Sequence, residues 1–232
     1  MTGPMTARRA VLWDIGGPID TEVAAEAMID TVLQDVASRH LGRAVSAADY
    51  AAANEAAVAQ FAPNAYQAIL WMLLGPAAPA AWPEVVAALP ARRFELRPGI
   101  ADLLHDLHAA GIALGLAANQ PAAVHADLQA AGLLALFTAQ GVSGTIGYRK
   151  PDPRLFLQAC DALAVPPGAV VMVGDRIDND IAPARGLGMA TIRFRTGRHR
   201  RQRPRSWLET PQAEVEDVPS LRAALWPMLQ IS

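Results

Sequence analysis

The sequence has few of the features that mark extracellular, membrane-spanning or nucleic-acid-binding proteins. Its only cysteine is Cys160, so no disulfide can form within the chain, and we expect a reducing, cytoplasmic location. The formal net charge is −2, so the whole molecule has no electrostatic attraction for nucleic acid or for a membrane surface. The most apolar stretch, residues 68–74, ends at Gly75-Pro76 and is far shorter than the roughly 20 residues that a membrane span requires.

The composition is that of a folded globular protein. Hydrophobic residues make up 52% of the chain and charged residues 18%, which excludes a disordered profile. The length of 232 residues suffices for one large domain, or for a core domain that carries a smaller one. Residues 1–9 are polar and do not resemble a signal peptide. Because Cys160 lies in an apolar helical pattern, we interpret it as a buried, inert thiol.

Two patterns of apolar residues follow one another along the chain. Residues 9–14 form a short apolar run that ends in Asp14 and a Gly-Gly-Pro turn, which predicts a buried strand that leads into a tight loop. Residues 21–90 have only helical periodicity. From residue 98 onward strands and helices alternate: we predict helices at 98–110, 121–131, 152–163 and 179–187, and strands at 112–117, 136–140, 168–174 and 190–195.

This alternation predicts an α/β fold with a Rossmann-like, doubly wound parallel sheet. Strands such as 112–117 are continuously apolar, as expected when helices cover both faces of a sheet. Right-handed crossovers between such strands give the doubly wound arrangement. The helical block interrupts the sheet after its first strand. We therefore interpret residues 1–20 and 91–232 as the core domain and residues 21–90 as an inserted, all-helical cap.

Charged side chains follow three of the predicted strands. Asp14 closes the first strand, Lys150 lies in the loop after the third, and Asp175 closes the fourth. Ligands bind at this edge of a doubly wound sheet. A carboxylate nucleophile, a cation and further carboxylates that hold Mg²⁺ are what phosphoryl transfer needs. Taken singly, each residue could be a turn, helix-capping or solvated side chain; their order and their sheet context are far more specific.

Four segments resemble, in order, the four motifs of the haloacid dehalogenase superfamily: VLWDIGG, LGLAANQ, GYRKPDPRLF and MVGDRIDNDIAPARGLGM. The resemblance spans residues 9–195. It implies a Rossmann-like core with an inserted helical cap. It also implies a phosphatase that needs Mg²⁺, acts on a small phosphorylated molecule and forms an aspartyl intermediate.

The resemblance also implies roles for individual residues. Asp14 corresponds to the nucleophile and to a metal ligand, and Lys150 to the lysine that stabilises charge. Asp175 corresponds to a metal ligand. Asp180 matches a second acidic position that supports the metal, directly or through water, and Asp178 is a weaker candidate for the same role.

The first motif departs from the phosphatases of the family. They place a second Asp two residues after the nucleophile, as general acid and base; here that residue is Gly16. Positioned acid–base catalysis contributes about 10²–10⁴-fold, so esters with poor leaving groups should be affected most. Gly16 keeps the backbone carbonyl that relatives use as a metal ligand. Pro18 stands where a Thr is expected and has no backbone N–H.

The second motif departs as well. The hydroxyl residue that holds a phosphate oxygen in relatives is Ala118 here. A hydrogen bond to a charged group contributes about 1.5–3 kcal/mol, so phosphate binding should be weaker. Asn119 follows, and two interpretations are open: its backbone and side-chain N–H groups compensate for the missing hydroxyl, or it caps helix 121–131.

Three alternatives follow from these departures. Asp20 or Glu22 could replace the missing acid, although we favour the interpretation of both as carboxylates at the hinge of the cap. Dehalogenases of the family also lack the second Asp, but they resemble SSN at the fourth motif and use no metal. The acidic segment GDRIDND therefore favours Mg²⁺ and phosphate. The alternative function is that of a catalytically impaired relative that binds a ligand or partner through the inherited site.

Two further segments carry candidate binding residues. The predicted cap contains polar and aromatic side chains that either contact substrate or form its core: Asn64, Tyr66, Gln67, Trp71 and Trp82. Residues 193–205 contain seven arginines. They form either an anion-binding loop or a solvated loop after the last core strand, and we favour the second. Because no second basic element with interleaved aromatics exists, we do not expect nucleic-acid binding. We expect a monomer or a dimer.

Overall fold

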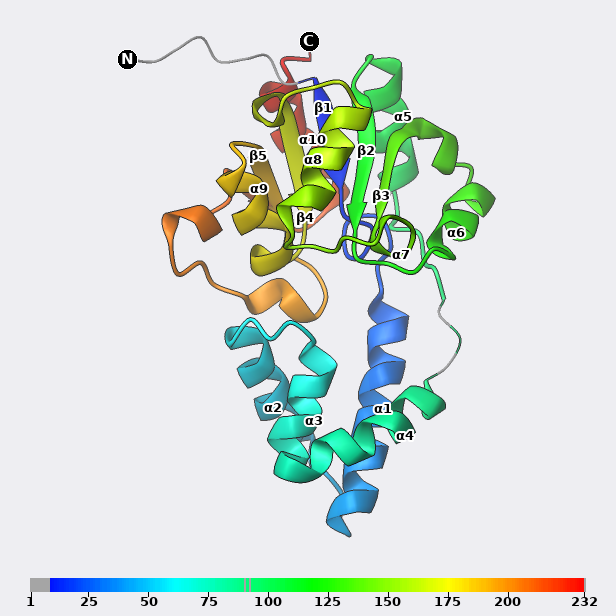
Figure 1. Ribbon diagram of the computed structural model, residues 1–232, viewed down its shortest axis with the longest axis vertical. Coiled ribbons are helices and arrows are strands. Elements are labelled where there is room, and N and C mark those ends of the chain that lie inside the picture. The colour runs from blue at the N-terminus through cyan, green and yellow to red at the C-terminus, as the bar shows by residue number, and fades with distance from the viewer. Residues whose placement is uncertain (1–8, 90, 92, 232) are drawn as a thin grey trace. The chain divides into compact units, whose positions relative to one another are not determined.

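The structure is a computed structural model that describes residues 9–89, 91 and 93–231 (Figure 1). The chain divides into two compact units. The core unit contains the chain up to Thr21, the segment Phe94–Thr196 and the chain from Pro204 onward. The helical unit contains Glu22–Arg93 and the short segment Gly197–Arg203.

A six-stranded sheet of order β3-β2-β1-β4-β5-β6 forms the centre of the core unit. Its strands are β1 (Ala10–Trp13), β2 (Ala113–Ala118), β3 (Phe137–Val142), β4 (Val170–Gly174), β5 (Ala190–Phe194) and β6 (Ala213–Val215). All neighbouring strands pair in parallel. Trp13 is in register with Leu116 of β2 and Val173 of β4, so the residues that follow these strands meet at one edge. The predicted α/β, Rossmann-like fold is confirmed.

Helices cover both faces of this sheet (Figure 1). They are α5 (Ile100–Ala109), α6 (Val124–Ala130), α7 (Ser143–Ile146), α8 (Pro153–Ala162), α9 (Ala182–Gly186) and α10 (Val218–Leu229). Val11 and Trp13 belong to the same apolar cluster as residues of α5 and α10, whereas Leu12 belongs to the cluster that contains α8. This alternation is expected because successive side chains of a strand point to opposite faces. The sequence pattern did not predict β6 or α10.

Cys160 of α8 lies in the second of these clusters and is 2% exposed. Burial raises the pKa of its thiol to about 11. A protonated thiol in an apolar environment is a poor nucleophile. The predicted burial of Cys160 is therefore confirmed, and the raised pKa is in keeping with an inert thiol.

The helical unit has an apolar core of its own. Its helices are α1 (Val23–Leu41), α2 (Ala47–Ala59), α3 (Ala65–Leu74) and α4 (Ala78–Ala88), and side chains from all four share one buried cluster. By length and composition alone, Ala65–Ala88 is apolar enough to cross a membrane. The structure interrupts this stretch with a 3-10 turn at Gly75–Ala77. Neither α3 nor α4 therefore reaches the roughly 20 residues that a membrane-spanning helix needs.

The segment Gly197–Arg203 follows β5 in sequence but groups with the helical unit. The side chain of Arg198 is 3% exposed, pairs with Asp30 and donates a hydrogen bond to Asn54. Its guanidinium carbon also lies 4.8 Å from the centre of the Tyr66 ring. From the sequence we placed these residues in the core domain. The partners of Arg198 lie more than a hundred residues away along the chain, so the local sequence gives no sign of them.

Three other arginines of residues 193–205 also form ion pairs, whereas Arg200, Arg201 and Arg203 are exposed, as the predicted solvated loop requires. Arg193 lies on β5, is 1% exposed and pairs with Glu214 over 2.9 Å. Arg195 and Arg205 form ion pairs with glutamates as well. The solvated-loop interpretation is therefore wrong for Arg193 and Arg198, whose side chains are buried.

Candidate active site

Four charged side chains meet at the carboxyl edge of the core sheet. Asp14 directly follows β1, Asp175 follows β4, and Asp180 lies in a π-helical turn just before α9. Each of these three carboxylates offers an oxygen within 4.8 Å of the others. Lys150, from the loop before α8, reaches the same place. The structure thus brings together the four residues that the strand ends and motifs pointed to.

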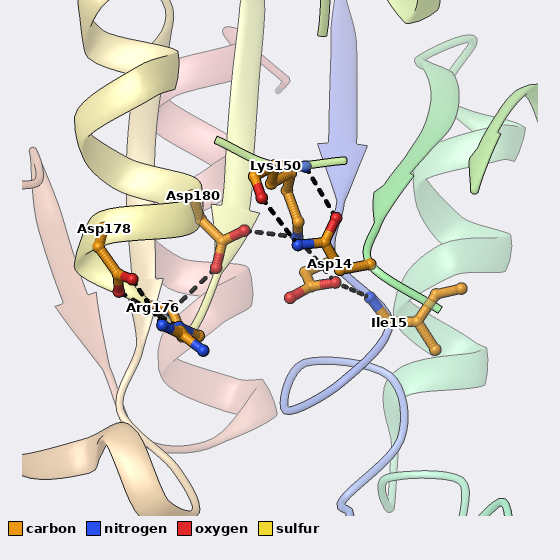
Figure 2. Close-up of polar contacts among 7 residues, drawn as sticks. Asp14, Ile15, Lys150, Arg176, Asp178 and Asp180 are labelled. Atoms are coloured by element: carbon orange, nitrogen blue, oxygen red, sulfur yellow. Dashed lines mark hydrogen bonds and ion pairs between the residues drawn. The ribbon is translucent and has the colours of Figure 1, made fainter. Parts of the chain in front are cut away.

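Lys150 is the centre of this cluster. Its Nζ lies 2.9 Å from Oδ1 of Asp14 and 2.5 Å from Oδ1 of Asp180, as Figure 2 shows. The lysine side chain is 1% exposed. Such a buried ammonium is tolerated only because carboxylates surround it.

Burial and charge act in opposite directions on the ionisable groups of the site. Burial raises the pKa of Asp14 to about 6, and the positive charge of Lys150 limits the increase. Burial by itself would lower the pKa of Lys150, but its attraction to Asp14 and Asp180 outweighs this effect and raises it. The lysine therefore remains a fixed positive charge beside the Asp14 carboxylate.

Asp180 uses both of its carboxylate oxygens. Oδ1 accepts from Lys150, and Oδ2 accepts a 2.9 Å hydrogen bond from the backbone N–H of Arg176. The π-helical turn Ile177–Ile181 sets this geometry, and such turns occur often at functional sites. Gly174 is needed here because a Cβ at that position would overlap with the carboxyl group of Asp180.

Asp178 points away from the carboxylate cluster. Its Oδ2 pairs with Nη2 of Arg176 over 2.5 Å, and its Oδ1 accepts from Nε of the same arginine over 3.2 Å (Figure 2). Within the described residues the cluster of possible metal ligands contains Asp14, Asp175 and Asp180. The structure therefore gives no support to Asp178 as a metal ligand. Arg176 and Asp178 are two residues apart, and nothing else in the sequence indicates that they form an ion pair.

The loop after Asp14 is folded tightly on itself. The backbone N–H of Ile15 donates to Oδ1 of Asp14 over 2.8 Å, and the N–H of Gly17 donates to the carbonyl of Asp20 over 2.8 Å. Gly17 has φ +86°, a left-handed conformation that favours glycine. Gly16 is buried between them. No carboxyl group stands at this position, so the loop offers only its backbone there.

Asn119 has a role that neither of its two interpretations anticipated. Its Nδ2 donates to the carbonyl of Lys150 over 2.9 Å, and its Oδ1 accepts from the N–H of Lys150 over 2.8 Å. It does not cap α6, whose N-cap residue is Ala123. Ala118, just before it, is completely buried at the end of β2. The Asn119 side chain thus fixes the backbone of Lys150, and its amide is engaged there.

Asp20 is completely buried, and its Oδ1 accepts from the backbone N–H of Glu95 over 3.0 Å. Its backbone bridges to Gly16 on one side and to Leu96 on the other. These contacts favour the hinge interpretation over that of a replacement acid. Glu22 belongs to the helical unit, where it is the N-cap residue of α1.

An acidic cluster around a buried lysine lies at the carboxyl edge of a Rossmann-like sheet. This arrangement is typical of one class of hydrolases. The sequence model of the family of haloacid dehalogenase-like hydrolases matches residues 9–188. Because this match covers most of the chain, the protein belongs to the haloacid dehalogenase-like hydrolase family.

Individual relatives are similar over shorter stretches. Glyceraldehyde 3-phosphate phosphatase of Methanopyrus kandleri is 40% identical over 75 residues, which cover 32% of each chain. Phosphoserine phosphatase of Thermus thermophilus is 34% identical over 128 residues, which cover 55% of this chain and 50% of that protein. The chain thus spans half or less of the length of these curated relatives.

The fold is also found in solved structures. The HAD-hydrolase YfnB of Bacillus subtilis superposes with a TM-score of 0.67 at 19% identity, over 97% of this chain and 100% of that one. At this level of identity the similarity concerns the fold.

Proposed function

We propose that this protein is a Mg²⁺-dependent phosphatase that hydrolyses small phosphorylated molecules through an aspartyl-phosphate on Asp14. The observation that carries the proposal is the position of Lys150 Nζ, within 2.9 Å of Asp14 and 2.5 Å of Asp180. Asp175 completes the acidic cluster. The phosphatase names of the two relatives support the same reaction class.

The residues of the cluster suit a hard divalent cation. Mg²⁺ prefers oxygen ligands, and three carboxylates offer oxygens within 4.8 Å of one another. Asp14, Asp175 and the Gly16 carbonyl would hold the ion. Asp180, whose oxygens accept from Lys150 and Arg176, would support the site mainly by holding Lys150 in place. When bound, Mg²⁺ supplies positive charge that offsets the charge of the phosphate and of the carboxylates.

The proposed reaction proceeds in two steps. The Asp14 carboxylate attacks phosphorus, the bond from phosphorus to the alcohol oxygen breaks, and the phosphoryl group is transferred to Asp14. Lys150 offsets the charge that develops on the phosphoryl oxygens. Water then hydrolyses the aspartyl-phosphate and releases phosphate.

The residue at position 16 limits which substrates react well. A departing alkoxide needs a proton, and Gly16 has no side chain to donate it. Phenolates and other stabilised leaving groups depart without that proton. We therefore propose a preference for phosphate esters with good leaving groups, and we propose that the helical unit is the inserted cap of the family. The free, buried thiol of Cys160 suits a cytoplasmic location.

A test of this proposal is hydrolysis of p-nitrophenyl phosphate by the purified protein, with Mg²⁺ and with EDTA. We expect turnover that requires Mg²⁺ and is lost in Asp14→Asn. Asp106→Asn is the matched control, because Asp106 lies on α5 and pairs with Arg222 on the surface. Magnesium-loaded protein that hydrolyses no member of a broad phosphate panel would contradict the proposal and favour a ligand-binding module.

A further inference from the structure

Arg97 binds the loop that follows Asp14. Its Nε donates to the carbonyl of Gly17 over 2.8 Å, and its Nη2 donates to Oγ1 of Thr196 over 3.0 Å. The guanidinium carbon lies 4.5 Å from the centre of the Phe194 ring, a cation–π contact. Three uncharged groups, one in the loop after Asp14 and two at the end of β5 or just after it, therefore fix the orientation of this guanidinium.

Gly17, which Arg97 holds, packs directly against Asp175. A Cβ at Gly17 would lie 2.9 Å from Cβ of Asp175 and 3.1 Å from Cγ2 of Thr196. Real Cβ atoms essentially never approach so closely, so the loop and the Asp175 side chain are in tight contact. A shift of the Gly17 backbone would change the space beside Asp175.

The residues on either side of Gly17 offer few groups that can fasten it, although Asp20, at the end of the loop, accepts from the N–H of Glu95. Gly16 has no side chain, and Pro18 has no N–H to donate. The N–H of Ile19 donates back into the loop, to the carbonyl of Ile15. In contrast, Arg97 binds the loop twice from another segment, since its backbone N–H also donates to the carbonyl of Ile19 over 2.8 Å.

The charge of Arg97 favours the same arrangement. Burial lowers the pKa of its guanidinium, and the carboxylates of Asp175 and Asp20 oppose this effect. Arg176 and Arg193 each form an ion pair with a neighbouring carboxylate. Among the contacts of the described residues Arg97 has no such ion pair. Its positive charge instead attracts the carboxylates of Asp175 and Asp20 from a greater distance.

From these contacts we propose that Arg97 is a positioning residue for metal binding. It keeps the Gly16–Gly17 backbone against Asp175, so that the Gly16 carbonyl and the Asp175 carboxylate stay together as ligands. The inference rests on the proposed function, because it concerns the same metal-binding residues. Arg97 acts through Gly17 and Thr196 and is not a catalytic residue.

The test compares Arg97→Met and Arg97→Lys with wild-type protein. Mn²⁺ affinity is measured by electron paramagnetic resonance, alongside the Mg²⁺ concentration for half-maximal p-nitrophenyl phosphate turnover and the melting temperature without metal. We expect Arg97→Met to bind Mn²⁺ about 10- to 100-fold more weakly, as is typical when a partner of a ligand is lost. Turnover at saturating Mg²⁺ should stay near that of the wild type. Arg97→Lys should recover part of the affinity, because one ammonium can reach only one of the two acceptors.

Arg222→Met is the matched control. Arg222 also lies over an aromatic ring, 4.6 Å from the centre of Trp226, but its side chain is 40% exposed and pairs with Asp106. Its loss should leave Mn²⁺ affinity unchanged. Thr196→Val removes one acceptor of Arg97 at nearly constant side-chain volume. Like Arg97→Met, it should weaken Mn²⁺ binding. It decides the question if Arg97→Met does not fold.

Two results would overturn the inference. One is unchanged Mn²⁺ affinity in folded Arg97→Met, or in Thr196→Val if Arg97→Met does not fold. The other is a loss of turnover at saturating Mg²⁺ with metal affinity intact, which would make Arg97 part of the catalytic step. Failure of the proposed function is distinguishable, because wild-type protein would then bind no Mn²⁺ and hydrolyse no phosphate before any change at Arg97.

Discussion

The ammonium of Lys150 lies 2.5 Å from Oδ1 of Asp180, and both side chains are almost completely buried. The same ammonium lies 2.9 Å from Asp14. One cation thus stabilises the fully buried carboxylate of Asp180 and that of Asp14, whose side chain is 12% exposed. This arrangement links the stability of the core unit to the chemistry proposed for its edge.

Lys150→Met should destabilise the protein as well as abolish turnover. Removing one partner of a buried ion pair typically costs about 3–5 kcal/mol, because the remaining charges are left uncompensated. Added Mg²⁺ should restore part of the free energy of unfolding, since it also compensates the carboxylates. Urea denaturation with and without Mg²⁺ measures both effects.

Arg154→Met serves as the control for Lys150, because Arg154 pairs with Asp152 at the surface of α8. Exposed pairs contribute little to stability. Equal losses in both variants would show that burial of the Lys150 pair has no special consequence.

Gly16→Asp should improve turnover of alkyl phosphates more than that of p-nitrophenyl phosphate. A positioned acid contributes about 10²–10⁴-fold for leaving groups that need a proton, and nitrophenolate does not need one. The ratio of kcat values for the two substrates checks this expectation. Similar gains for both substrates, or no gain, would mean that protonation of the leaving group does not limit the reaction.

Ala118→Ser should strengthen phosphate binding. Ala118 ends β2 at the edge where the carboxylates and Lys150 lie, and a hydroxyl there can donate to a phosphate oxygen. A hydrogen bond to a charged group is worth about 1.5–3 kcal/mol, which corresponds to roughly tenfold or more in affinity. Inhibition by inorganic phosphate measures it. An unchanged inhibition constant would show that phosphate does not approach this residue.

Arg198→Met should destabilise the helical unit by about 3–5 kcal/mol, because Asp30 and Glu26 would lose their buried cation. The loss should be smaller at pH 5 than at pH 8. Burial raises the pKa of Glu26 and Arg198 holds it down, so without Arg198 the folded state binds a proton more readily. Protonation then stabilises the fold at low pH, and this stabilisation disappears as the pH rises through the raised pKa.

Chemical denaturation at the two pH values measures this effect. Arg201→Met, an exposed arginine of the same segment, is the control. A loss in Arg198→Met that does not depend on pH would contradict the electrostatic explanation.

Much of the fold and the central site could be predicted from the sequence. Apolar runs that end in Asp14 and Asp175 specify parallel strands, and parallel strands deliver their end residues to one edge. The loop after the third predicted strand placed Lys150 at the same edge, and the motif resemblance added Asp180. The positions of these residues could be predicted because each depends on a local sequence pattern combined with a simple rule of sheet topology.

The parts that escaped prediction depend on tertiary partners. Nothing near Arg198 in sequence indicates that its carboxylate and amide partners lie on α1 and α2. Asn119 binds the backbone of Lys150, which a helix-capping pattern does not suggest. Arg97 precedes a Pro-Gly turn and shows no link to Gly17 until the chain is folded. Strand β6 has three residues, too few for a recognisable alternation.

The most direct test of the central claim is to trap the intermediate on Asp14. Protein that is mixed with Mg²⁺ and a ³²P-labelled phosphate ester and quenched with acid should carry label on the peptide that contains Asp14. Hydroxylamine should release this label, and Asp14→Asn should show none. Turnover without label, or label on another residue, would contradict the account.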